Sequence, residues 1–350
     1  MQTQPSNRLI IRRWSAVSPY GIGAQAFIDG LREGAATERP LMYDEGPYRS
    51  AHLVPDFSPA SALGKKGTRS MDRATALAVT TVRELLDGLP ESLVGDRPGL
   101  VLGTTTGSAS SMMEFTRDSL TGQRPFFVDP ARFPNTVMNC AAGQCAIWHN
   151  LTGPNATVAG GRLSAFHALN YAKRLIRTRR ASSIIAAAVE EYSTARAWLE
   201  AVQGQSRLLG EGCGALLVTD DTRTDSDLDD VEVEVLSVQL GVSLDSSKAA
   251  LTRLIHRTLE QAGLTAADVD AVSFTDTDNE SQVAAAAAVL GTDFTVVPPV
   301  EAGDCGAAAG ALGLVATVNH LTSQECPTTV LTVCTEDEEQ AVGCALLRLA

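Results

Sequence analysis

The stretch that decides the fold is GPNATVAGGRLSAFHAL, which occupies residues 153–169. A Gly-Pro pair leads into the β-branched run 156–158, which predicts a short strand. The small and apolar residues of 164–169 predict a buried helix directly after it. Arg162 stands between the two, where the strand turns into the helix. Because a guanidinium stays protonated at any pH that a protein tolerates, Arg162 cannot act as a nucleophile at this turn.

The composition is that of a large globular chain with an acidic balance. With 350 residues, of which 44% are hydrophobic, the chain can form one large domain or two fused halves. The net charge of −13 argues against nucleic-acid partners and against anionic membrane surfaces. An acidic protein partner would need a local basic patch on this chain.

The cysteines indicate packed thiols and no cofactor site. The seven cysteines form no CxxC pair and no zinc spacing with the five histidines, so we expect no metal and no cofactor. Several lie in apolar runs, as is typical of small buried side chains in a reducing compartment. The N-terminal segment does not read as a signal peptide, and no apolar run of about eighteen residues occurs, so we expect a cytoplasmic protein without a membrane span.

Short apolar runs that predict strands alternate with longer helical patterns, and this alternation predicts an α/β fold. The predicted strands are Arg8–Ile11, Gly99–Leu102, Ser183–Ala188, Ala215–Thr219, Asp270–Phe274, Phe294–Val297 and Thr328–Cys334, with an alternating strand at VEVEVLSVQLGV. The predicted helices are Ala24–Gly34, Met71–Leu86, Cys140–Asn150, Ala165–Arg177, Ala249–Ala262 and Ala307–Leu321.

One Asp-rich stretch, residues 220–227, interrupts this alternation and has the composition of a solvated linker. It predicts a boundary between an N-terminal half, residues 1–220, and a C-terminal half, residues 228–350. Two α/β halves in one chain are typical of an internally duplicated fold.

Six segments occur in the order and at the spacing of one protein family. They are SAVSPYGIGAQAFIDGLREG, RSMDRATALAVTTVRELL, GTTTGSASSMMEF, FPNTVMNCAAGQCAIWHNLTGPN, the triplet at 189–191 and GDCGAAAGALGLV. Together with the opening stretch they resemble the β-ketoacyl synthases of the thiolase superfamily, over residues 8–349. The resemblance implies an α/β fold of the thiolase-like kind, a duplicated α-β-α-β-α layered fold with mixed five-stranded sheets.

The resemblance also implies where the family's catalytic residues would stand. The family uses a Cys that accepts the acyl chain and two His that act on the malonyl thioester. The Cys position is Arg162, the first His position is Thr275, and the second is Asp304. All three groups are therefore replaced, and no catalytic residue is predicted at these degenerate positions.

Three other thiol or imidazole groups leave a catalytic alternative open. Cys145 and His149 are four positions apart on a predicted helix, and Cys305 follows Asp304 directly. The alternative is thus a catalytically active acyltransferase or hydrolase homodimer with a displaced Cys nucleophile. A decarboxylase that lacks only the Cys is disfavoured, because such a member keeps both histidines. A regulatory or scaffold protein without a ketosynthase partner is a third hypothesis.

Arg162 itself has two interpretations. If it is buried, it requires a partner, because an unpaired buried guanidinium costs several kcal/mol. That partner would be Asp304 or a group across a subunit interface. If the loop has instead moved outward, Arg162 is simply solvated.

Two further segments carry interface predictions. Met112, Met113, Phe115 and Thr116 are either core residues or, by resemblance, the wall of an acyl-chain tunnel at a subunit interface. A basic cluster with Lys173, Arg174 and Arg177 is either a solvated helix end or a docking site for an acidic carrier protein.

The pattern as a whole resembles the chain-length-factor subunit of type II polyketide synthases. The resemblance implies a non-catalytic subunit that forms a heterodimer with an active ketosynthase and bounds the acyl-chain tunnel. The other implied partner is an acyl carrier protein with a phosphopantetheine-bound acyl chain, and no nucleic acid or membrane is implied. Aromatic-polyketide members usually carry Gln at the lost Cys position and are longer, so Arg162 favours a highly reducing or polyene-type pathway.

Overall fold

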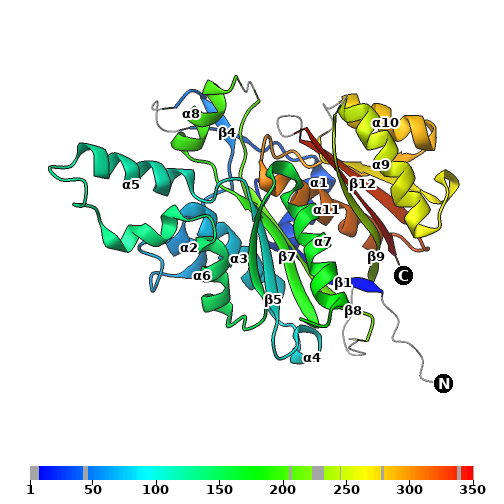
Figure 1. Ribbon diagram of the computed structural model, residues 1–350, viewed down its shortest axis with the longest axis horizontal. Helices are drawn as coiled ribbons and strands as arrows, with labels where there is room; N and C mark the ends of the chain where they lie inside the picture. Colours follow the sequence, from blue (N-terminus) through cyan, green and yellow to red (C-terminus); the bar gives the residue numbers. More distant parts are fainter. Residues whose placement is uncertain are drawn as a thin grey trace.

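A mixed sheet of eleven strands runs through the middle of the protein in the computed structural model (Figure 1). The structure describes residues 8–41, 46–204, 207–222, 232–244, 246–276, 280–336 and 340–349. The sheet contains β1 (Leu9–Ser18), β2 (Gly21–Ile22), β5 (Gly99–Thr104), β6 (Asn155–Ala159), β7 (Ser183–Glu190), β8 (Gly212–Asp220), β9 (Val233–Val242), β10 (Ala271–Phe274), β11 (Thr295–Val296), β12 (Thr329–Glu336) and β13 (Ala341–Leu349). A separate pair consists of β3 (Glu38–Pro40) and β4 (Ser50–His52).

The strand order shows an internal duplication. The first half has the order β6-β5-β7-β8-β1 and the second half has the order β11-β10-β12-β13-β9, so the two halves match strand by strand. In each half the first three strands are parallel to one another. The fourth strand is antiparallel to the third, and the fifth is antiparallel to the fourth. β1 and β9 pair through Ile10↔Glu234 and Ile11↔Val233, which joins the two mixed five-stranded sheets into one. The expected layered fold is therefore confirmed.

Helices cover the sheet in three layers. They are α1 (Gly23–Glu33), α2 (Pro59–Leu63), α3 (Arg73–Leu86), α4 (Glu91–Val94), α5 (Ala109–Thr121), α6 (Cys140–His149), α7 (Ser164–Arg177), α8 (Thr194–Val202), α9 (Ser247–Ala262), α10 (Glu280–Leu290) and α11 (Ala307–Thr322), with 3₁₀ turns η1 (Pro130–Thr136), η2 (Gly161–Leu163) and η3 (Ala266–Asp268). One hydrophobic core contains α7 and α11 between the two half-sheets. A second lies under α3 and α6, and a third under α9 and α10.

Alternation along the strands separates these cores. On β5, Val101 belongs to the central core, whereas Leu100 and Leu102 belong to the core beneath α3. Because successive side chains of a strand point to opposite faces, one strand can serve two cores. None of the helices in the described part of the chain is long and apolar enough to span a membrane.

The predicted boundary between the halves falls largely outside the described residues, since 223–231 lie outside them. The halves 1–220 and 228–350 therefore remain a proposal; β8 ends at Asp220, and the second set of strands begins at Val233.

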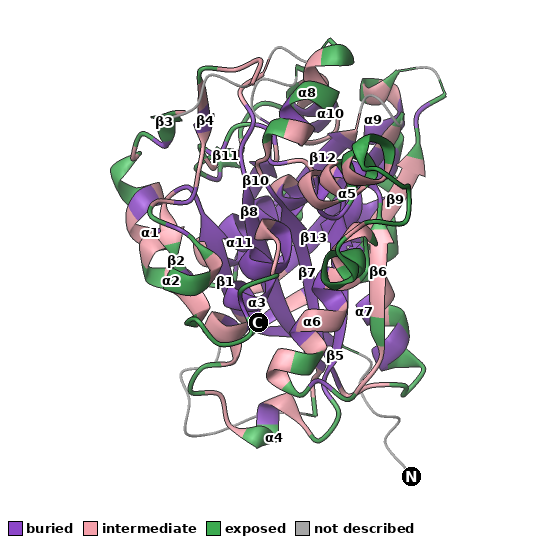
Figure 2. Cartoon of the chain, turned by 90° about the vertical axis from the view of Figure 1, so that its left-hand side faces the viewer, coloured by how far each residue is buried: buried purple, intermediate pink, exposed green. Residues whose placement is uncertain are grey.

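The α5–η1 segment extends away from the sheet (Figure 1, left), and Figure 2 shows α5 nearly end-on with a mostly exposed surface. Only Ala109 of α5 is buried. Met112 and Met113 are 37% and 47% exposed, so the core interpretation of these methionines is wrong for this chain by itself. At the end of the same half-sheet, β6 pairs with β5 on one side only.

Candidate functional site

The turn between β6 and α7 brings Arg162 into the interior. Gly161 has φ +50°, and a Cβ there would collide with the carboxylate of Glu336. This glycine therefore lets Glu336 approach the backbone, where its Oε2 accepts a hydrogen bond of 2.7 Å from the Arg162 amide. A Cβ at Gly310 of α11 would likewise collide with the Arg162 carbonyl oxygen. Close approach of α11 and β12 thus fixes the backbone of the turn.

The side chain of Arg162 is paired. Its Nη2 lies 2.6 Å from Oδ2 of Asp304, and its Nη1 lies 3.2 Å from Oδ2 of Asp276. The Arg162 side chain is only 14% exposed. Of the two interpretations of Arg162, the structure therefore bears out the pairing with Asp304 and contradicts the solvated loop.

Two more arginines contact the same two acidic residues. Arg207 donates to both oxygens of Asp276, with Nη2 2.7 Å from Oδ1. Arg196 is buried and donates to the carbonyl oxygen of Asp304 over 2.9 Å. We call Arg162, Arg207, Asp276 and Asp304 the Arg162 cluster. The cluster thus pairs two guanidinium groups with two carboxylates, and Arg196 adds a third guanidinium 3.9 Å from Asp304.

The electrostatics of the cluster favour the charged forms. Burial by itself would raise the pKa of Asp304, but the guanidinium groups of Arg162 and Arg196 outweigh it and hold that pKa below its ordinary value. Burial would likewise lower the pKa of Arg162, but Asp304 and Asp276 outweigh it and raise that pKa. Arg162 and Asp304 are therefore both ionised at neutral pH.

All three degenerate positions line one pocket. This Arg162 pocket has a volume of about 380 Å³ and contains Arg162, Thr275 and Asp304 in its wall. The remaining lining residues are His52, Arg207, Leu208, Phe274, Asp276, Pro299, Val300, Glu301, Ala302 and Gly303. Thr275 and Asp304, which are 113 and 142 positions after Arg162 in the sequence, thus lie in the same pocket wall as Arg162.

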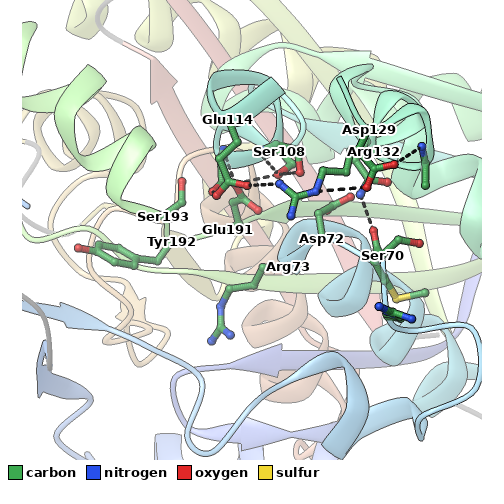
Figure 3. Close-up of a pocket in the computed structure, with 16 residues that line it drawn as sticks. Ser70, Asp72, Arg73, Ser108, Glu114, Asp129, Arg132, Glu191, Tyr192 and Ser193 are labelled. Atoms are coloured by element: carbon green, nitrogen blue, oxygen red, sulfur yellow. Dashed lines mark hydrogen bonds and ion pairs between the residues drawn. The ribbon is translucent and has the colours of Figure 1, made fainter. Parts of the chain in front are cut away.

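A larger pocket of about 720 Å³ lies beneath α5 and η1 (Figure 3). Glu191 is at its base, where the carboxylate accepts from the Ser110 amide of α5 and the Ala74 amide of α3, both over 3.2 Å. Burial raises the pKa of Glu191 to about 7, and the carboxylates of Asp72 and Glu190 add to this rise. One buried carboxyl group therefore joins the N-termini of two helices.

A family model described as "Beta-ketoacyl synthase, N-terminal domain" matches residues 14–224, which is more than half of the chain. The chain belongs to the β-ketoacyl synthase family. It is 36% identical to a chain of the structure "The ishigamide ketosynthase/chain length factor", with a TM-score of 0.88 over 98% of this chain and 99% of that one.

More distant relatives agree with this assignment. The chain is 25% identical over 193 residues to a 3-oxoacyl-(acyl-carrier-protein) synthase 2 of Vibrio harveyi, which covers 53% of this chain and 46% of the relative. It is 31% identical over 199 residues to a "Putative polyketide beta-ketoacyl synthase 1" of Streptomyces halstedii, covering 52% and 46%. The chain thus spans about half the length of the curated relatives it matches. A structure of the AntDE ketosynthase with the carrier protein AntF, at 17% identity and a TM-score of 0.82, shares the fold.

Cys145 and Cys305 of this β-ketoacyl synthase family member are poorly suited to nucleophilic attack. Cys145 is fully buried, and burial raises its pKa well above the ordinary value. His149, its predicted neighbour, directs Nε2 at the Val79 carbonyl oxygen over 2.9 Å. Cys305 is also fully buried, its Sγ lies 2.9 Å from the Ala302 carbonyl oxygen, and burial raises its pKa. The structure does not bring a thiolate to the Arg162 pocket from any of these positions.

The predicted tunnel and docking residues lie elsewhere. Met112 and Met113 are on the exposed surface, and the Phe115 ring is 5.9 Å from the ring of Phe133. Lys173, Arg174 and Arg177 lie toward the C-terminal end of α7, whereas Arg162 precedes its first residue. Arg174 and Arg177 are exposed, and Lys173 is half-buried, where burial and the nearby Arg177 lower its pKa.

The resemblance implied no role for four residues that shape these pockets: Arg207, Asp276, Glu336 and Glu191. Asp276 follows Thr275 directly, so a search for the partner of a buried arginine could have found it. In the described part of the chain, no group of three or more His, Cys, Asp or Glu side chains could hold a metal ion.

Proposed function

We propose that this chain is a non-catalytic, cytoplasmic chain-length-factor subunit of a type II polyketide synthase, which pairs with an active ketosynthase and bounds its acyl-chain tunnel. The observation that carries the proposal is the ion pair of Arg162 with Asp304 at two of the family's three catalytic positions. These two positions carry paired charges, so neither a thiolate nor an imidazole stands where the resemblance places the family's Cys and second His.

The chemistry of each replacement supports this proposal. Arg162 has no lone pair to attack a thioester, and Thr275 cannot replace an imidazole as a hydrogen-bond donor of matched pKa. Asp304 is ionised, so it accepts hydrogen bonds and would repel the negative charge that develops on an oxygen. The Arg162 amide already donates to Glu336, so it is not free to stabilise such an oxygen.

The partner surface would be the side of the first half that carries α5, η1, α6 and β6. Large apolar side chains are exposed there without a covering element, as is typical of an interaction surface. They are Met112, Met113, Leu120, Phe126, Phe127, Phe133, Val137, Met138 and Ile147. The open edge of β6 adjoins this half, and an uncovered sheet edge also favours association. In the assembled pair, Met112, Met113, Phe115 and Thr116 would form the tunnel wall.

We also propose a carrier-protein contact. On a chain with net charge −13, the exposed Arg174 and Arg177 with Lys173 offer a local positive surface for an acyl carrier protein with its phosphopantetheine-bound chain. A ketosynthase in complex with its type II carrier protein is among the similar structures. This contact rests on charge alone.

The pathway would be of the highly reducing or polyene type. Arg162 replaces the Gln that aromatic-polyketide members usually carry. The identity of 36% to the ishigamide ketosynthase/chain length factor, against 17% to AntDE, supports a branch near the former.

Expression of this chain by itself and together with the ketosynthase encoded beside it tests the proposal. We expect malonyl consumption only from the pair, and only when the partner retains its cysteine. Cys-dependent turnover by the isolated chain would favour the acyltransferase or hydrolase homodimer. Failure of any ketosynthase to co-purify would favour the scaffold hypothesis.

A further inference from the structure

The ionic contacts of the Arg162 pocket cross between the two halves of the chain. Arg162, Arg196 and Arg207 come from the first half, whereas Asp276 and Asp304 come from the second. Within these contacts, every cation belongs to one half and every anion to the other. The attraction of Arg162 and Arg207 to Asp276 and Asp304 therefore acts between the halves, whereas Arg196 also lies 3.6 Å from Glu200 of its own half.

The same contacts hold the turn that follows β6. The Arg162 amide donates to Glu336 over 2.7 Å, and Sγ of Cys334 lies 3.6 Å from the Arg162 carbonyl oxygen. The Arg162 side chain donates hydrogen bonds to Asp276 and Asp304. Three segments of the second half, at Asp276, at Asp304 and in β12, therefore contact the backbone or the side chain of Arg162. Only Gly160 and Gly161 separate Arg162 from the end of β6.

We propose that the Arg162 cluster is a clasp between the halves that fixes the β6–α7 turn and, through it, the edge strand β6 that the partner ketosynthase would contact. Arg162 is a positioning residue in this arrangement. Its role for the partner rests on the proposed function, whereas its role in the turn does not.

The geometry explains why arginine suits this position. Asp276 follows β10 and Asp304 precedes α11, so the two carboxylates belong to different elements. The planar guanidinium reaches one with Nη1 and the other with Nη2. A lysine has one nitrogen on a flexible stem, so it cannot hold both carboxylates in the same fixed fork. The clasp therefore depends on the guanidinium and not on positive charge alone.

Hydrogen exchange of the isolated chain tests the clasp directly. In Arg162→Gln we expect protection of the amides at 160–163 to fall by about two orders of magnitude, because two buried carboxylates lose a partner. Arg162→Lys is expected to recover only part of that protection. The matched control is Arg257→Gln on the exposed surface of α9, which is expected to leave this region unchanged.

Chemical rescue separates the clasp from simple packing. In Arg162→Ala, millimolar ethylguanidinium should restore protection of residues 160–163, whereas ethylammonium at the same concentration should not. If Arg162→Ala does not fold, the Gln and Lys variants still give the answer. Unchanged protection in Arg162→Gln, or equal rescue by both cations, would overturn the clasp.

Partner binding tests the second part. With the ketosynthase that binds the wild-type chain, we expect Arg162→Gln to weaken affinity by about tenfold or more, with Arg257→Gln as the control. Equal affinity of Arg162→Gln and wild type would overturn the link to β6. If the wild-type chain binds no ketosynthase, the proposed function fails, and the exchange experiment still decides the clasp.

Discussion

The Arg162 pocket and the pocket beneath α5 treat buried charge in opposite ways. Around Arg162, Asp304 and Asp276 each face guanidinium groups, and the pKa of Asp304 stays below its ordinary value despite burial. Beneath α5, Glu191 is buried beside the carboxylates of Asp72 and Glu190, and its pKa rises to about 7. Both carboxyl groups are deeply buried, so the sign of their neighbours makes the difference.

This contrast separates two uses of one family scaffold. In the Arg162 pocket, carboxylates are paired with guanidinium groups, as is expected of a structural contact. The pocket beneath α5 holds a group that titrates near neutral pH, at the N-termini of two helices. Arg162 and Asp304 pair with one another, so the fold can be retained without the family's Cys and second His at these positions.

The largest expected effect is a loss of stability when the Arg162 pocket is changed. Replacement Arg162→Met should lower the free energy of unfolding by about 3 kcal/mol, because Asp276 and Asp304 are left without this partner in a buried site. Urea denaturation at pH 7 measures it, with Arg257→Met as the exposed control. A loss as small as that of the control would show that the pairing contributes nothing to stability.

The next effect concerns the pH dependence of Glu191. Its folded pKa is raised from 4.5 to about 7, so the stability that it contributes is full below 4.5 and is lost as pH rises through 7. Between pH 6 and 8 this loss should be about 1 kcal/mol, and Glu191→Gln should remove it. Urea denaturation of both proteins across this range gives the comparison.

Asp304 should behave with the opposite sign and serves as the internal contrast. Its folded pKa is below 3.8, so its contribution is present above 3.8 and is lost as pH falls through the lower folded value. Asp304→Asn should therefore leave the slope between pH 6 and 8 unchanged. A flattened slope in this variant would remove the distinction between the pockets.

A smaller effect on stability, with a change in product, is expected on α5. Met112→Ala and Met113→Ala should each change the free energy of unfolding by less than about 0.5 kcal/mol, because both methionines are exposed. Phe115→Ala should change it slightly more. If these side chains limit the tunnel, the complex should then make longer products, as read by mass spectrometry. Leu244→Ala, an exposed apolar residue outside the proposed partner surface, is the control. Unchanged product length in all three variants, with an intact complex, contradicts the tunnel assignment.

The smallest effect is expected at the end of α7. Replacing Lys173, Arg174 and Arg177 together by Gln should weaken carrier-protein binding a few-fold at low salt and not at high salt, because exposed charges are screened. Titration with the apo carrier protein at two ionic strengths measures this. Salt-independent affinity in the wild type would exclude this surface.

Much of the fold could be predicted from local patterns. The predicted strands at Gly99–Leu102 and Ser183–Ala188 lie within β5 and β7, because continuous β-branched and apolar runs are typical of buried strands. β13, in the run AVGCALLRL, was not predicted, since a short apolar run has no periodicity that separates strand from helix. α10 was not predicted either, because its Ala-rich sequence lacks a clear polar face.

The site was predictable only where chemistry demanded a partner. A buried guanidinium requires an anion, and that rule led from Arg162 to Asp304. Nothing local links Arg207 to Asp276, which are 69 positions apart, or Glu336 to the Arg162 amide, because these contacts arise from the layering of the two halves. Glu191 belongs to the triplet at 189–191 that carried the family resemblance. Its carboxylate accepts hydrogen bonds from backbone amides of α3 and α5, and these bonds depend on where those helices begin.

The absence of an acyl-accepting nucleophile is the central claim, and intact-protein mass spectrometry tests it most directly. This chain and its ketosynthase partner are incubated together with an acyl-loaded carrier protein, and the mass of each subunit is then measured. We predict an acyl increment on the partner only, sensitive to hydroxylamine as a thioester is. A hydroxylamine-sensitive acyl increment on this chain, abolished by replacing one of its own cysteines, would contradict the account.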